Sequence, residues 1–280
     1  MTTTTTKTSL SEDGPKPAEK LPATQRCRVE PLKIEVQDGP NGFVPGFLHL
    51  PTGFAKGLAT SPNQTAAILL SGAGGGVVGP SSMYLSIADK LASLANGIPC
   101  LRLDYRYPAR NRYCVRDVFT AMDLLQDMYG LRRFVLVGWS FGGAPVFTAG
   151  GTDERVVGCA TVASQTAETE GIKRLSPRPV LLLHGTGDKT LSPSCSQRLY
   201  DWYGTQGDRT LRLFDGDDHA LTRNAEKAEI LISRFIATCA GLKVDEMEQK
   251  RVLESKLLED GDRIENMRKG GDLTGQEHLE

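Results

Sequence analysis

The sequence predicts an α/β protein in which helices cover a mostly parallel, doubly wound sheet of about eight strands. Three observations indicate this fold class. Short apolar runs recur along the chain, segments of helical periodicity separate the later runs, and Gly, Pro or Asn stands between neighbouring elements. Strands that alternate with helices pair in parallel, because each helix carries the chain back to the same end of the sheet.

The first three strands are expected before any helix. The runs PLKIEVQ, FVPGFLHLP and QTAAILLSG are mainly apolar and are bounded by turn-forming residues. Later strands each follow a helix, and PVLLLHG has the continuous apolar pattern of a strand that is covered on both faces. The expected strands cover residues 31–37, 43–51, 64–72, 98–106, 132–140, 156–164, 179–185 and 209–216.

The helices are expected from apolar residues that recur three or four positions apart. SSMYLSIADKLASLAN and AEKAEILISRFIATCAG each place such residues on one face, and RDVFTAMDLLQDMYG ends at Gly130, a usual helix stop. The expected helices cover residues 81–96, 116–130, 141–151, 166–175, 192–204 and 225–241.

The two ends of the chain differ in composition from the middle. Residues 1–26 are rich in Thr, Ser, Lys, Glu and Pro, so we expect a disordered tail. The predicted domain spans residues 27–242. Residues 243–280 are charged and helix-prone, with an interruption at Gly261. We expect a helical or disordered tail there, and it is the candidate surface for a partner or for self-association.

Charge and composition exclude several classes of protein. The 33 Lys and Arg residues nearly balance the 34 Asp and Glu residues, so no global field draws the chain to nucleic acid or to an anionic membrane. The start of the chain has no apolar signal segment, and no run of about 18 apolar residues follows, which predicts a cytoplasmic protein. The six cysteines form no C-x-x-C pair, so we expect neither zinc nor disulfides, and no organic cofactor.

The segment FVLVGWSFGGAPVF carries the strongest chemical signal. Gly138-Trp139-Ser140-Phe141-Gly142 matches G-x-S-x-G between a predicted strand and a predicted helix, which is the context that this nucleophile motif requires. A sharp turn there would lift the hydroxyl of Ser140 above the sheet. The N–H of Phe141, at the start of the helix, would point at the same place. A serine that merely caps a helix is the alternative interpretation.

A serine nucleophile needs a base, and the four histidines can be compared by position. His278 lies in the charged tail, His49 lies inside a strand, and His184 ends an apolar strand, where it would satisfy backbone groups. His219 lies in the polar loop DGDDHAL after the last strand, at the carboxyl edge where open α/β sheets bind ligands. We therefore expect His219 to be the base.

The base in turn needs a carboxylate that orients it. Asp188 follows PVLLLHG directly and so lies at the same carboxyl edge. Asp217 and Asp218 are rivals because they are close to His219 in sequence, but neighbouring residues rarely reach back to the ring in the needed geometry. The chain order Ser140, Asp188, His219 is the order found for this chemistry on α/β sheets.

These motifs resemble those of the α/β-hydrolases, over roughly residues 31–241. GWSFGG, HGTGD and GDDHAL carry the resemblance, and LDYR is similar to the usual end of the fourth strand. Only about fifteen residues separate the strands at 156–164 and 179–185, so the layout resembles uncapped, dienelactone-hydrolase-like members without a lid domain. Ser140 stands where those enzymes typically have cysteine. The resemblance also nominates the backbone N–H of Ala73 as the second oxyanion donor, beside Phe141.

The predicted function is hydrolysis of an ester or thioester of a small or medium acyl group, with Ser140 as nucleophile, His219 as base and Asp188 as its orienting group. An acyltransferase or a peptidase would use the same triad. The side chains expected to contact this small-molecule substrate are Trp139, Tyr84, Tyr107 and Leu191, and, for an anionic group such as that of a CoA thioester, Arg106 and Arg110.

Two further alternatives come from other classes of protein. Gly74 to Gly79 form a G-x-G-x-x-G pattern with Asp104 after the next strand, which resembles an NAD(P) fingerprint. The strand is the third of the sheet, however, and Pro80 follows at once. The fold could also be kept as a non-catalytic binding protein, although the presence of all three triad candidates argues against this.

Overall fold

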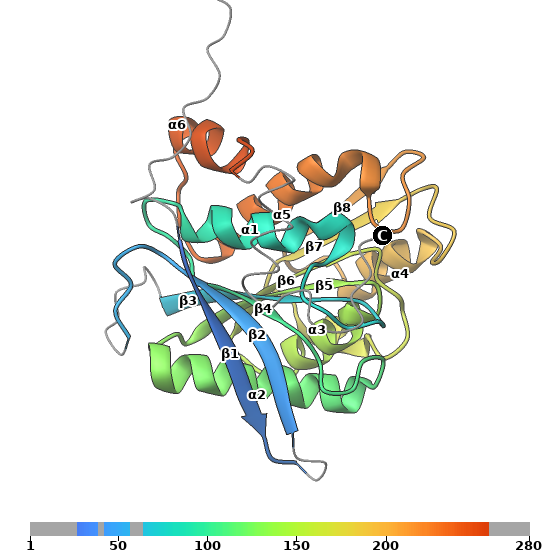
Figure 1. Ribbon diagram of the computed structural model, residues 1–280. Helices are drawn as coiled ribbons and strands as arrows, with labels where there is room; N and C mark the ends of the chain where they lie inside the picture. The colour runs from blue at the N-terminus through green and yellow to red at the C-terminus, as the bar shows by residue number, and fades with distance from the viewer. Residues whose placement is uncertain (1–26, 39–41, 57–63, 258–280) are drawn as a thin grey trace, which may run out of the picture.

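The computed structural model describes residues 27–38, 42–56 and 64–257. An eight-stranded sheet runs through the molecule in the order β1-β2-β4-β3-β5-β6-β7-β8 (Figure 1). β1 and β2 pair antiparallel, β2 pairs antiparallel with β4, and every later pairing is parallel. The strands are β1 Arg28–Val36, β2 Gly42–Leu50, β3 Thr65–Leu70, β4 Cys100–Leu103, β5 Arg133–Trp139, β6 Val156–Val162, β7 Val180–Gly185 and β8 Arg209–Phe214. The predicted doubly wound sheet is confirmed.

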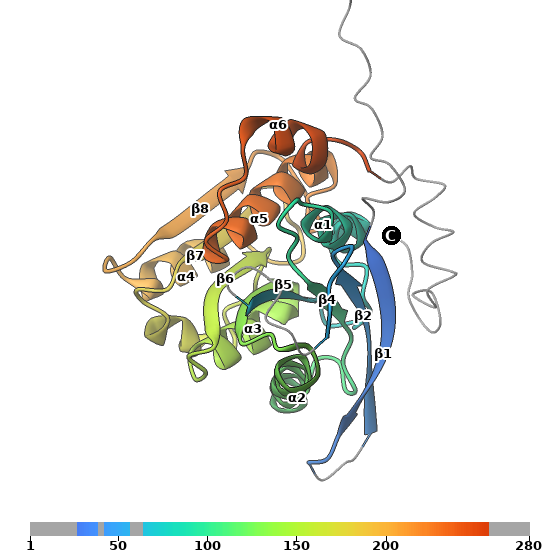
Figure 2. The ribbon, with the colours of Figure 1, turned by 90° about the vertical axis from the view of Figure 1, so that its left-hand side faces the viewer.

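Helices cover both faces of this sheet (Figures 1 and 2). One layer holds α1, α5 and α6, and the opposite layer holds α2, α3 and α4. The helices are α1 Met83–Ala92, α2 Asn111–Tyr129, α3 Gly143–Gly150, α4 Ser194–Tyr203, α5 Ala225–Cys239 and α6 Glu246–Glu248. Short 3₁₀ turns add η3 Pro80–Ser82, η4 Ser140–Gly142, η5 Glu170–Arg174 and η6 Thr222–Asn224, and a π-helical turn, η7, covers Gln249–Leu253. Among the described residues, none of these helices combines the length and apolar character needed to span a membrane.

The central strands are apolar throughout because each of their faces joins a different core. All six residues of β3 are buried. Ala66, Ile68 and Leu70 pack in the core under α2 and α3. Ala67 and Leu69 point the other way, into the core under α1 and α5. A strand with alternating polar residues would leave unpaired polar groups on one of these buried faces.

Three expected helices differ clearly from the observed ones. The helix expected at residues 116–130 begins earlier, as α2 at Asn111. The helix expected at residues 166–175 is only the turn η5, because the backbone of Gly171 packs on α3: a Cβ there would lie 1.9 Å from the carbonyl oxygen of Phe147. The helix expected from residue 81 begins at Met83, because Ser81 and Ser82 both adopt positive φ angles. In the described residues, η5 and its flanking turns form the whole β6–β7 connection, so the sheet has no lid.

The packed part of the chain continues past residue 242. Val252 and Leu253, within η7, are fully buried in the core of the α1 and α5 layer. The ammonium of Lys90, in α1, donates to the carbonyl oxygen of Leu253 at 2.9 Å and forms an ion pair with Glu229, in α5. The tail expected at residues 1–26 and most of the one expected beyond residue 243, with its proposed partner role, lie outside the described residues.

Candidate active site

The turn after β5 holds Ser140 in a strained backbone conformation. Its φ is 54°, in the left-handed region that side-chain-bearing residues seldom adopt. The neighbouring glycines are needed because the chain closes on itself here. A Cβ on Gly138 would lie 2.4 Å from the carbonyl oxygen of Gly142, and one on Gly142 would lie 2.6 Å from that of Ser71. This is the strand-to-helix elbow that the motif predicts, and strain of this kind concentrates at functional sites.

The loops after β7 and β8 bring Asp188 and His219 together. His219 Nδ1 lies 2.6 Å from Asp188 Oδ2, and the Asp188 side chain is fully buried. The other carboxylate oxygen accepts the backbone N–H groups of Thr190 and Leu191, at 2.7 and 2.9 Å. Burial alone would raise the pKa of Asp188, but the hydrogen bonds from His219 and from the two backbone groups hold it below its ordinary value. Asp188 is therefore an anion that orients the imidazole.

The rival carboxylates serve a different purpose. Asp217 is fully buried, and its two oxygens accept the backbone N–H groups of Arg223 and Asn224 and the side-chain amide of Asn224. Asp218 accepts from the backbone of Ala220 and Thr222. Both groups hold the turn that leads into α5, so the sequence-based choice of Asp188 agrees with the geometry.

Trp139 ties the histidine loop to the elbow. Its indole N–H donates to the carbonyl oxygen of His219 at 3.1 Å, and the two rings lie 5.6 Å apart between centroids. Trp139, the residue before Ser140, thus holds the loop that carries His219 next to the elbow. In the described part of the chain the hydroxyl of Ser140 makes no hydrogen bond. Hydrogen bonds between a nucleophilic serine and its base often shorten only when substrate binds.

The glycine-rich loop after β3 lies against the serine. A Cβ on Gly72 would be 3.5 Å from Ser140 Cβ, so Ala73, the next residue, is exposed at the same edge. Three side chains anchor this loop from below. Tyr84 donates to the carbonyl oxygen of Leu70 at 2.9 Å, Tyr105 donates to that of Ser71 at 3.0 Å, and Asp104 accepts the N–H of Gly76 at 2.7 Å.

The structure corrects two of the expected substrate contacts, those of Tyr84 and Arg106. Tyr84 has no exposed surface and supports the loop from within the core. The guanidinium of Arg106 is buried between Asp38 and Asp117, at 2.8 and 2.5 Å, and these partners raise its pKa. Neither side chain can reach a substrate. The helical periodicity of the segment indicates the burial of Tyr84, whereas nothing in the sequence around Arg106 indicates its partners.

The other expected contacts lie nearer the surface. Tyr107 is 40% exposed, and Arg110 is exposed at the start of α2. The loop that carries them packs closely on the glycine-rich loop. A Cβ on Gly75 would lie only 2.9 Å from Pro108. Leu191 is half-buried, and its backbone binds Asp188.

His184 is a site residue that the sequence analysis assigned to a backbone role. It is fully buried at the end of β7, and its Nε2 lies 3.1 Å from both Asp188 Oδ2 and the carbonyl oxygen of Leu191. The spacing H-x-x-x-D, which returns the chain to its own strand end, is the signal that would have indicated the carboxylate contact.

A Cys–His–Asp cluster at the opposite edge of the sheet has donors that suit a metal in type. Cys27, His49 and Asp89 lie close together, but Arg102 Nε donates to His49 Nε2 at 2.9 Å. The imidazole proton is therefore on Nδ1, which lies 2.7 Å from Asp89 Oδ1. With Nε2 bound to Arg102 and Nδ1 protonated, neither ring nitrogen offers the lone pair that a metal would need. Burial and Asp89 also raise the pKa of the Cys27 thiol, so the donor set fits a hydrogen-bonded network instead.

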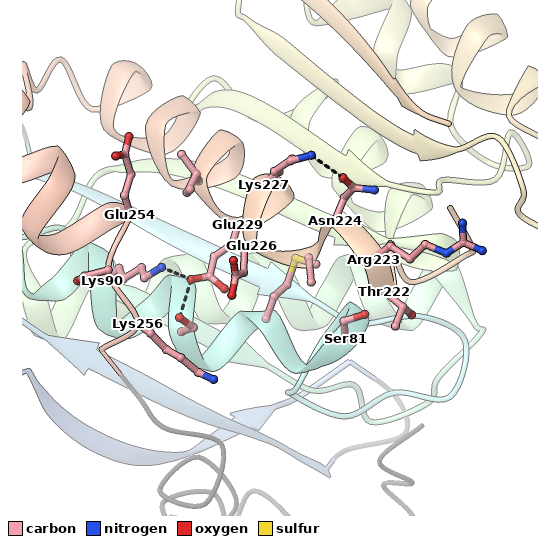
Figure 3. Close-up of a pocket in the computed structure, with 15 residues that line it drawn as sticks. Ser81, Lys90, Thr222, Arg223, Asn224, Glu226, Lys227, Glu229, Glu254 and Lys256 are labelled. Carbon is pink, nitrogen blue, oxygen red and sulfur yellow. Dashed lines mark hydrogen bonds and ion pairs between the residues drawn. The ribbon is translucent and has the colours of Figure 1, made fainter. Parts of the chain in front are cut away.

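A polar groove of about 550 Å³ runs between α1 and α5 (Figure 3). Lys90 and Glu229 form an ion pair at its base, and Lys227 reaches Asn224 along its side. Ser81, at one end, donates to the carbonyl oxygen of Ala220, beside the histidine loop. No triad candidate lines this groove.

The sheet order, the strained elbow and the missing lid together define the uncapped α/β-hydrolase fold. No family model and no curated protein matches the sequence. Among solved structures, the chain is similar to a dienelactone hydrolase from Anabaena variabilis, with a TM-score of 0.60 and 16% identity, covering 75% of this chain and 98% of that one. It is also similar to Est1E from Butyrivibrio proteoclasticus, with a TM-score of 0.58 and 14% identity, covering 75% and 99%.

A third similar structure is XC6422 from Xanthomonas campestris, described as a serine hydrolase without lid. The TM-score is 0.54 at 15% identity, and the match covers 79% of this chain and 97% of that one. The three matches confirm the predicted fold and the resemblance to dienelactone-hydrolase-like structures.

Proposed function

We propose that this protein is a serine hydrolase that cleaves a carboxylic ester or thioester of a small or medium acyl group. The observation that carries the proposal is the strained φ of Ser140 at the elbow, next to a buried Asp188 that holds His219. Ser81 and Ser82 also adopt positive φ angles, so strain alone does not mark a nucleophile, and the proposal depends on its combination with the His219–Asp188 pair. The similar structures described as a dienelactone hydrolase and as a serine hydrolase support the same class of reaction.

The proposed mechanism uses the chain's own residues. His219 Nε2 removes the proton of Ser140 as Oγ attacks the substrate carbonyl, and Asp188 keeps the proton of Nδ1 in place. The backbone N–H groups of Phe141 and Ala73 stabilise the oxyanion. Collapse breaks the bond to the alcohol or thiol, which leaves with the proton from His219. Water then attacks the acyl-enzyme, with His219 again as base, and frees the acid and Ser140.

The NAD(P)-binding alternative and one expected substrate contact both lose support from the structure. The carboxylate of Asp104 is bound to the N–H groups of Gly76 and Tyr105, at 2.7 Å each, so it holds the glycine-rich loop where a dinucleotide site would use it on a ribose. For the anionic substrate group, Arg110 remains a candidate and Arg106 does not, because Arg110 is exposed and lies two residues after Pro108, which packs on the glycine-rich loop.

A fluorophosphonate probe with intact-mass detection tests the proposal. We expect one adduct on the parent protein and none on Ser140→Ala. With a neutral chromogenic ester, Ser140→Ala and His219→Ala should each lower kcat by about 10⁴-fold to 10⁶-fold. No adduct on the parent, or a loss below about tenfold in both variants, would show that the assignment is wrong.

A further inference from the structure

A second histidine shares the carboxylate of Asp188. His184 Nε2 and His219 Nδ1 approach the same oxygen, Oδ2, at 3.1 and 2.6 Å. On its other side, His184 Nδ1 lies 2.7 Å from the hydroxyl of Ser196, which is fully buried in α4. The chain of contacts therefore runs from Ser196 through His184 and Asp188 to His219.

The partners of His184 determine where its proton lies. Asp188 Oδ2 and the carbonyl oxygen of Leu191 can only accept hydrogen bonds, so Nε2 carries the hydrogen. Nδ1 then has a lone pair, and Ser196 donates to it. Burial holds the pKa of His184 below its ordinary value, which agrees with a neutral ring. The two acceptors at Nε2 thus fix the tautomer that donates to the carboxylate, and Ser196 binds the lone pair that remains at Nδ1.

This contact completes the surroundings of Asp188. Two backbone N–H groups bind Oδ1 and two imidazoles bind Oδ2, which uses the four lone-pair positions of the carboxylate. Besides His219 itself, the two backbone N–H groups and His184 thus hold the carboxylate and fix the position of Oδ2. Part of its negative charge is also directed to His184, so less of it acts on His219.

We propose that His184, which donates from Nε2 to Asp188 and accepts from Ser196 at Nδ1, is a positioning residue of the proposed catalytic triad. It orients the Oδ2 atom of Asp188 and moderates the hold of this carboxylate on the protonated base. The inference depends on the proposed function, since it assigns a role within the same site. The titratable groups that face His184 are Asp188 and His219, from the loops after β7 and β8, and α4 contributes the hydroxyl of Ser196.

The first test compares His184→Leu with His184→Gln, using p-nitrophenyl acetate and normalising to the sites that the fluorophosphonate titrates. Leu removes the donor, while the amide of Gln can reach Asp188. We expect His184→Leu to lower kcat by about 10-fold to 100-fold with little change in KM, the factor that one hydrogen bond to a charged group is worth. His184→Gln should recover most of this loss.

The pH profile separates positioning from support of the fold. Without the His184 donor, the charge of Asp188 acts on His219 alone and favours the protonated base. The acidic limb of kcat/KM should therefore move to higher pH in His184→Leu and return in His184→Gln. The matched control is His49→Leu, which removes a fully buried histidine from another Asp, at 2.7 Å, at the far edge of the sheet. It should leave the limb in place.

Ser196→Ala tests the hydrogen bond that holds His184 from α4, and it decides the question if His184→Leu fails to fold. We expect the same upward movement of the limb, at smaller size. Its control is Ser233→Ala, because Ser233 is buried in α5 and its hydroxyl has no hydrogen-bond partner in the described structure. Unchanged kcat and pH profile in Ser196→Ala and in the folded His184 variants would overturn the inference. If the parent protein itself is not labelled at Ser140, the proposed function fails first.

Discussion

At the scale of single residues, the triad candidates were predictable because few residues could fill each role. Ser140 was found from its motif, and His219 was found by comparing four histidines. The pairing of His219 with Asp188 agrees with the expectation that two loops at the carboxyl edge meet. The role of Ser140 as nucleophile stays a prediction until it is labelled.

The residues that were misjudged depend on burial and long-range contacts. Arg106 follows a strand as a substrate-binding arginine would, but its partners are Asp38, in the turn after β1, and Asp117, in α2. Tyr84 lies on the buried face of α1, where its hydroxyl binds the carbonyl oxygen of Leu70 and its ring does not line the site. The periodicity of the helix indicates that Tyr84 is buried, but the local sequence contains nothing about the ion pairs of Arg106.

Arg110 provides a prediction about substrate charge. Because Arg110 is exposed and follows Pro108, which packs on the glycine-rich loop, we expect Arg110→Ala to raise KM for a succinyl ester or thioester by about tenfold, as loss of a charge-assisted hydrogen bond would. KM for the neutral butyryl analogue should stay the same. Arg112→Ala, at a neighbouring exposed position, is the control. Equal effects on both substrates would remove Arg110 from the site.

At the scale of helices and strands, the pattern that sequence reasoning reads best is the strand buried on both faces. β3, β5 and β7 are almost wholly buried, and each was expected within about two residues of its observed ends. The segment around η5 was misread because a helical pattern there competes with close backbone packing on α3. That competition is decided by Gly171, and its effect appears only in three dimensions.

The segment after α5 gives a prediction about stability. Leu253 is fully buried, so Leu253→Ala should lower the free energy of unfolding by about 2–5 kcal/mol, the usual cost of a cavity in a core. Urea unfolding measures this value. Met247→Ala is the matched control, since Met247 is 77% exposed in α6 and should change stability little. A cost for Leu253→Ala no larger than that of the control would mean that this segment does not anchor to the domain.

At the scale of the whole molecule, the two edges of the sheet hold similar groups with different surroundings. One buried His–Asp pair, His49 with Asp89, is closed by Arg102 at the amino edge. The other, His184 with Asp188, continues to His219 at the carboxyl edge. The sequence shows all four groups as scattered polar residues. Their separation into two sites follows from strand direction, because His184 lies at the carboxyl end of β7 and His49, in β2, lies opposite the start of β4.

The pH dependence of stability provides a prediction at this scale. Since burial holds the pKa of His184 below its ordinary value of 6.5, the unfolded chain binds a proton there that the folded protein does not. Its contribution to stability is present above about pH 6.5 and is lost as pH falls through the lowered pKa. The lowered pKa of Asp89 and of Asp188 acts at lower pH, below about 4.

We therefore expect the free energy of unfolding to fall from pH 7 to pH 5 in the parent protein and to fall less in His184→Gln. Urea titrations at the two pH values measure the difference. An equal decrease in the two proteins would contradict the prediction, because it would place the acid sensitivity on other groups.

No lid domain covers the carboxyl edge in the residues that the structure describes, and this bears on the fate of the proposed acyl-enzyme. No domain has to open for substrate to enter or for product to diffuse away, so turnover would not wait on a gating motion. Bulk solvent would also reach the acylated serine freely. A competing alcohol or amine acceptor would then have to displace water without any enclosure to exclude it, and this partitioning favours hydrolysis over acyl transfer.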